Sequence, residues 1–254
     1  MGYIQMIAFS FSDIGNRCEN LDLLSTINCQ NDVFGMVIMD GYSCSEWNMK
    51  ILSGRLDKCV FSGDLNKDII EPCKSVPVKA AVCFLFKNNT HLHIYNAGDC
   101  RVYNKSGVLL TEDNSVAWKR LKENGIDNKK IPHLVCYCPD RNYLTSFVDF
   151  CSDEIIFNHS VFDLNDENKE VILCTDGFWE HFNDGTVIDL MKDNPESNLA
   201  KFTKNIPGNA ENHTVCYVRE GANKQVISSQ ADSLIKISRI WADFFPANTS
   251  NQPI

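Results

Sequence analysis

Short apolar runs that stop at polar turn residues are the clearest pattern along the chain. Such runs are typical of strands that are buried in a core, and three of them stand out. They are Val33–Met39, Val171–Cys174 and Thr214–Val218. An Asp-Gly pair follows the first run directly and the second after one residue, and its glycine permits the sharp turn that ends a strand.

Two hairpins are expected from apolar segments that flank polar turns. The first joins Ala80–Phe86 to His91–Tyr95, and the second joins Arg101–Tyr103 to Val108–Leu110. His91 and His93 fall on one face of their strand. A solvated strand face is the expected reading of that pair, and a metal pair is the alternative.

Helical periodicity is weaker and predicts four helices. They are Ser43–Val60, Ser115–Asn124, Asp184–Lys192 and Gln225–Phe245. We expect one domain over residues 1–222, a C-terminal amphipathic helix within 223–245, and a disordered tail over 246–254. The C-terminal helix is expected to pack back on the domain, with a partner or dimer surface as the alternative.

Composition narrows the class of protein. The 254 residues are 44% hydrophobic, which suffices for a sizeable core. A net charge of −9 argues against a general nucleic-acid binder. No apolar run approaches the roughly 18 residues of a membrane span, and the N-terminus lacks the pattern of a signal peptide. A cytoplasmic protein is expected, with export as an effector left open.

Twelve cysteines raise the question of a disulfide framework. No C-x-x-C pair exists, and several cysteines lie within apolar runs, where they behave as small hydrophobic residues. Reduced thiols are therefore expected.

The two Asp-Gly pairs carry the first chemical hypothesis. Asp40 and Asp176 each stand where a buried strand leaves the core. If two such carboxylates meet, they repel unless cations lie between them, and hard ions such as Mg²⁺ or Mn²⁺ suit carboxylate, carbonyl and water ligands. Taken singly, each pair also reads as an ordinary turn.

Six segments in order extend this hypothesis to a family. They are Gly15–Asp22, Asp40-Gly41, Gly98–Arg101, Leu110–Ser115, Thr175–Glu180 and Glu211–Val215. Together they resemble the protein phosphatase 2C family, the metal-dependent Ser/Thr phosphatases, over about residues 8–219. The family motifs are G-x-R-x-x-[NM]-E-D, D-G, G-D-S-R, L-T-x-D-[HN]-S, [SC]-D-G-[LF]-W-[DE] and D-N-x-T-V.

The resemblance implies an α/β (α+β) four-layer sandwich, in which helices flank two central antiparallel sheets. It also implies two Mn²⁺ or Mg²⁺ ions. Asp40 would bridge the two ions, and the Gly41 carbonyl would help to bind one of them. Asp176 and Glu211 would complete the coordination shell of the other ion.

Further roles follow from the same resemblance. Asp99 and Glu180 would recruit a weak third ion, and Asp22 would hold a water. Arg17 would bind the substrate phosphate, and Asn212 would support the carboxylate beside it. The implied activity is hydrolysis of phosphoserine and phosphothreonine by a metal-activated water. The expected partners are a phosphoprotein substrate and a cognate Ser/Thr kinase system, and the protein is expected to be a monomer.

The sequence departs from the family at four of these positions. Leu21 stands where a metal-binding Glu is usual, while Glu211 and Glu180 replace Asp. Tyr42 stands where Met or His is usual, and its hydroxyl is a candidate proton donor. These departures keep two alternatives open: an inactive phosphatase fold that binds a partner, and an acidic adaptor that acts through its C-terminal helix.

Overall fold

The computed structural model describes residues 6–183 and 185–219. Their strands form two sheets, one in the order β1-β11-β10-β7 and one in the order β4-β2-β3-β5-β6-β9, with β8 paired to β5. The strands are β1 (Ile7–Asp13), β2 (Asp22–Cys29), β3 (Phe34–Tyr42), β4 (Val60–Phe61), β5 (Lys79–Lys87), β6 (His91–Ala97), β7 (Arg101–Asn104), β8 (Val148–Asp149), β9 (Asn158–Asp163), β10 (Val171–Cys174) and β11 (His213–Val218). All neighbours are antiparallel except β2 and β4, which pair in parallel.

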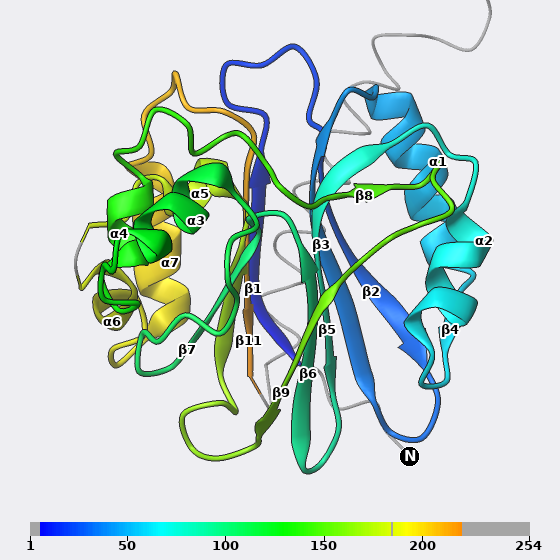
Figure 1. Cartoon of the computed structure of the whole chain (residues 1–254). Helices are drawn as coiled ribbons and strands as arrows, with labels where there is room; N and C mark the ends of the chain where they lie inside the picture. The colour runs from blue at the N-terminus through cyan, green and yellow to red at the C-terminus, as the bar shows by residue number, and fades with distance from the viewer. Residues whose placement is uncertain (1–5, 184, 220–254) are drawn as a thin grey trace, which may run out of the picture.

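The two sheets lie face to face, and helices cover the outer side of each (Figure 1). Alternation along the central strands produces this layering. Met36 and Ile38 of β3 join the core between the sheets, whereas Val37 and Met39 join the core under the helices. Both faces of β3 are therefore apolar, as its uninterrupted run of hydrophobic residues predicts.

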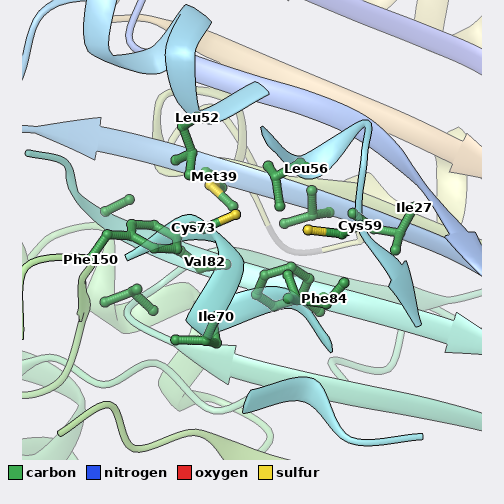
Figure 2. Close-up of a cluster of buried hydrophobic side chains, with 14 of the residues drawn as sticks. Ile27, Met39, Leu52, Leu56, Cys59, Ile70, Cys73, Val82, Phe84 and Phe150 are labelled. Carbon is green, nitrogen blue, oxygen red and sulfur yellow. The ribbon is translucent and has the colours of Figure 1, made fainter. Parts of the chain in front are cut away.

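The helices are short. They are α1 (Glu46–Leu56), α2 (Glu71–Cys73), α3 (Val116–Glu123), α4 (Ile131–Val135), α5 (Asp176–Trp179), α6 (Thr186–Leu190) and α7 (Pro195–Lys204), with a π-helical turn η1 (Asn66–Ile70) before α2. Ser45 caps α1 by accepting a hydrogen bond from the Asn48 amide. Leu52 and Leu56 of α1 belong to the same buried cluster as Met39 of β3, which Figure 2 shows.

The fold confirms the expected α/β sandwich with two central sheets. The three strands predicted from apolar runs are present, and so is the first hairpin. The second hairpin is also present, although its second arm is not a full strand. The amides of Asn104 and Leu110 donate across it to the carbonyl oxygens of Val108 and Val102, around a bridge between Tyr103 and Leu109. The parallel β2–β4 pair corrects the expectation of purely antiparallel sheets.

Three predicted helices are shorter than expected and correspond to α1, α3 and α6. Several further elements were not expected: β1, β2, β4, β8 and β9, and α2, α4, α5 and α7. Most of them are too short, or mix polar and apolar residues too irregularly, to show a clear period. The predicted C-terminal helix and tail lie outside the described residues. Within the described ranges, no helix is both long and apolar enough for a membrane crossing. The twelve cysteines all fall within those ranges and form no disulfide there.

Candidate active site

A pocket of about 980 Å³ brings segments from across the chain together. It takes residues from the β1–β2 loop, the end of β3, and the turns that follow β6 and β10. Most of the predicted site residues line it: Arg17, Asp40, Gly41, Asp99, Asp176, Glu211 and Asn212. Asp22 and Glu180 are not among the lining residues of the described chain.

Asp40 owes its place to the alternation of β3. It continues the series of Met36 and Ile38, which face the gap between the sheets, but it stands where that gap opens into the pocket. Gly41 follows because the chain packs too closely there for a side chain. A Cβ at this position would lie 2.8 Å from the Leu21 carbonyl oxygen, which accepts a hydrogen bond from the Gly41 amide.

Asp22 lies directly opposite Asp40, in register across β2 and β3. Its Oδ2 accepts a hydrogen bond of 2.9 Å from the Thr175 hydroxyl. Its Oδ1 is buried and has no hydrogen-bond partner among the described residues. Burial raises the pKa of Asp22 to about 7, and the nearby Asp176 adds to the rise. A buried carboxylate with an unsatisfied oxygen favours a ligand that can donate a proton or positive charge.

Asp176 begins α5 one residue after the end of β10. Its Oδ1 accepts a hydrogen bond of 2.6 Å from the Gly177 amide, which fixes the carboxylate at the turn. Burial raises the pKa of Asp176 to about 6, with repulsion from Glu180 and Glu211 as further causes. Gly177 permits this geometry, because a Cβ there would lie 2.1 Å from the Asn212 carbonyl oxygen.

Burial, and after it the repulsion between neighbouring acids, dominates the electrostatics of the pocket. Burial is the main cause that raises the pKa values of Asp40 and Asp99 well above their usual range, and the charge of Asp176 comes next for both. Carboxylates that raise one another's pKa are relieved by protons or by cations.

The oxygen atoms at the pocket suit a hard divalent ion as ligands. Carboxylates, the Gly41 carbonyl and an unsatisfied Asp22 oxygen are ligand types that Mg²⁺ and Mn²⁺ accept. Among the described residues, no three His, Cys, Asp or Glu side chains are already arranged around an ion position. Ion binding therefore requires the side chains to adjust, most of all Glu211.

Glu211 is engaged with Arg17 at the rim of the pocket. Its Oε1 lies 2.5 Å from Nη2 of Arg17, and both side chains are about half exposed. The expected metal ligand and the expected phosphate-binding residue thus neutralise each other. Glu211 must turn away from Arg17 before it can coordinate an ion.

Asn212 holds the loop that carries Arg17. Its Oδ1 accepts from the Leu21 amide at 2.9 Å, and its Nδ2 donates to the carbonyl oxygens of Ile14 and Glu19 at 2.8 and 3.0 Å. These bonds connect the segment before β11 to the β1–β2 loop. This role differs from the support of the neighbouring carboxylate that the resemblance implies.

Glu180 is bound by Arg141. The Arg141 Nε and Nη2 atoms lie 2.7 and 2.6 Å from one Glu180 oxygen, and both side chains are mostly buried. Arg141 belongs to the segment between α4 and β8 and was not predicted. Its position depends on a contact between residues distant in sequence, and no local pattern signals it. Lys79, Tyr143 and Phe147 also line the pocket and were not predicted as site residues.

A buried ion pair outside the pocket helps to fix the turn that carries Asp99. The Arg101 Nε and Nη2 atoms donate to the two oxygens of Asp113 at 3.0 and 2.7 Å. The guanidinium also lies 3.6 Å from the centre of the Trp179 ring, and Trp179 Nε1 donates to the Asp99 carbonyl at 2.9 Å. The turn that carries Asp99 is therefore anchored to a rigid cluster.

The chain has the fold of the 2C-type Ser/Thr phosphatases, as a comparison with solved structures shows. It is similar to the Ser/Thr phosphatase Stp1 from Staphylococcus aureus, with a TM-score of 0.66 and 17% identity over 86% of this chain and 97% of that one.

It also resembles the PPM Ser/Thr phosphatase MsPP from Mycobacterium smegmatis in complex with cacodylate. That match has a TM-score of 0.60 and 16% identity, and covers 84% of this chain and 97% of that one. The catalytic domain of PstP in complex with two manganese ions gives a TM-score of 0.58 at 15% identity over 83% and 96%. No protein-family model and no curated protein sequence matches the chain.

Proposed function

We propose that the chain is a metal-dependent protein Ser/Thr phosphatase. One observation carries the proposal: Asp40, Asp99 and Asp176 converge in a pocket that also contains Arg17. The raised pKa values of these acids support a site that is completed by cations. PstP, which shares the fold, binds two manganese ions in its solved structure.

In the proposed site, Asp40, the Gly41 carbonyl, Asp176 and Glu211 would hold two Mn²⁺ or Mg²⁺ ions. Such ions, when bound, polarise a phosphoryl group and lower the pKa of a coordinated water. Asp99 would serve a weaker third ion. The pairing of Glu180 with Arg141 argues against Glu180 as its second ligand, because the guanidinium already neutralises that carboxylate.

The other residues bind and orient the substrate. Arg17, once free of Glu211, matches two phosphate oxygens with its guanidinium. Asp22 would hold the attacking water through its unsatisfied Oδ1. As the water oxygen forms a bond to phosphorus, the bond to the Ser or Thr oxygen would break. The water would release a proton to solvent, and the leaving oxygen would take up a proton from a donor that regains it from solvent. Tyr42 lines the pocket and is the proposed donor.

A second candidate function is partner binding without catalysis. Leu21 removes an expected ligand, and the ion pair between Arg17 and Glu211 occupies two functional groups. The proposed substrate is a phosphoprotein that a Ser/Thr kinase has modified. The monomeric state and the cytoplasmic location stay predictions from the sequence.

The deciding experiment measures hydrolysis of p-nitrophenyl phosphate and of a phosphothreonine peptide with Mn²⁺. Activity that EDTA and Asp176→Asn abolish supports the enzyme. Asp166→Asn is the matched control, since Asp166 is almost fully exposed and pairs only with Lys169 among the ion pairs of the described chain. A protein that binds Mn²⁺ but hydrolyses neither substrate would favour the binding function.

A further inference from the structure

A group of histidines lies on the helix-side face of the larger sheet, away from the pocket. His91 and His93 of β6 alternate with Leu92 and Ile94, which face the core between the sheets. His159 of the edge strand β9 stands opposite Tyr95 and one diagonal step from His93. The cross-strand pairing therefore brings imidazoles from two strands to one surface.

The geometry of His93 and His159 is that of a chelating pair. Nδ1 of His93 lies 3.4 Å from Nε2 of His159, and the two rings are inclined by only 18°. Two nitrogens that bind one tetrahedral ion at about 2.0–2.1 Å are themselves about 3.3–3.4 Å apart. The observed separation thus matches the bite of a metal ion. The two nitrogens share a hydrogen bond in the structure, so each ring must rotate before both lone pairs point at an ion.

The surroundings of His93 favour its neutral, ligating form. Partial burial lowers the pKa of His93, and the neighbouring His159 and His91 lower it further. The His159 ring stacks on Tyr95 with centroids 4.0 Å apart and an angle of 4°, which limits its motion. An ordered imidazole loses little entropy when it binds a metal ion.

We propose that His93 and His159 form a peripheral binding site for a borderline divalent ion such as Cu²⁺, Ni²⁺ or Zn²⁺. Imidazole prefers these ions, whereas the carboxylates of the pocket suit Mg²⁺ and Mn²⁺. The site is a two-histidine chelate completed by water, consistent with the lack of a ready three-ligand group among the described residues. The bound ion connects β9, at the edge of the sheet, to β6. This inference is independent of the phosphatase proposal.

The test is electron paramagnetic resonance of one equivalent of Cu²⁺ on tag-free protein in excess Mg²⁺, which occupies carboxylate sites. The expected spectrum shows hyperfine coupling to two nitrogens. His93→Asn and His159→Gln should each lose the two-nitrogen pattern and weaken Cu²⁺ binding on the order of a hundredfold, because the two imidazoles act as a bivalent ligand. His133→Gln, on α4, is the matched control and should keep the pattern.

A second measurement uses thermal unfolding. Zn²⁺ should raise the unfolding midpoint of the wild-type protein, because an ion that binds only the folded state stabilises it, and it should not raise that of the His93→Asn/His159→Gln variant. Circular dichroism confirms that the variants are folded. The proposal is overturned if Cu²⁺ bound to the wild-type protein has only oxygen ligands. It is also overturned if the two-nitrogen pattern persists in the double variant.

Discussion

Asp113→Asn tests the buried ion pair beneath the site, because it removes the charge and keeps the shape. Arg101 is 1% exposed and Asp113 is 0% exposed, and both carboxylate oxygens accept from the guanidinium. The amide would place a donor against one of the two guanidinium donors. Loss of one partner of a buried ion pair costs about 3–5 kcal/mol. Tyr103 and Pro132 still accept from Arg101 Nη1, which favours the lower end of this range.

The assay is urea unfolding of the metal-free protein, followed by fluorescence. For a slope of about 3 kcal/mol per molar, the midpoint should fall by about 1–1.5 M. The matched control is the adjacent Glu112, whose 2.7 Å pair with Lys122 is half exposed. Glu112→Gln should cost about 0.2–1 kcal/mol, as exposed pairs do. If the two variants unfold at the same urea concentration, the reasoning about burial is wrong.

Three further predictions concern the site. Leu21→Glu should lower the Mn²⁺ concentration for half-maximal activity about tenfold, a gain of about 1.4 kcal/mol in binding, which a metal titration measures. Metal-free protein should lose stability as pH rises from about 4 to 7, since folding raises the pKa of Asp22 to about 7 and the folded state holds the proton longer. Asp22→Asn should flatten that dependence in urea unfolding at several pH values. Gly177→Ala should destabilise by about 2 kcal/mol or more, because the new Cβ meets the Asn212 carbonyl. Gly54→Ala in α1 is the control, because its new Cβ would have no atom within 4 Å. It should stabilise the protein by about 0.5–1 kcal/mol. Equal effects of the two substitutions would contradict this reasoning.

Much of the central fold was predictable because its signals are local. The apolar run of Val33–Met39 predicts a strand that is buried on both faces, and β3 is such a strand. Strand β2 was missed because its residues alternate irregularly between exposed and buried positions. Its place is decided by pairing with β3, which is a tertiary effect.

The same distinction between local and long-range signals applies to the site. The motif resemblance predicted four of the acids that line the pocket, namely Asp40, Asp99, Asp176 and Glu211, because each follows a strand or turn that local sequence marks. Asp22 and Glu180 were also predicted but are not among the described lining residues, and Glu19, which lines the pocket, was not predicted as a site residue. The resemblance did not predict the partners of the acids. The Arg17–Glu211 and Arg141–Glu180 pairs join residues that are far apart in sequence, and neither pair follows from a local pattern.

The backbone at Leu21 bears on the choice between an enzyme and a binding protein. Its amide donates to Asn212 and its carbonyl accepts from Gly41, so the main chain is held on both sides although the side chain is apolar. Leu21 also lines the pocket, and a longer carboxylate at this position would enter it. The loss of a ligand is therefore confined to one side chain, while the scaffold that would present it is complete. Leu21→Glu therefore tests the choice between catalysis and partner binding directly, because it restores a carboxylate without a change to the main chain.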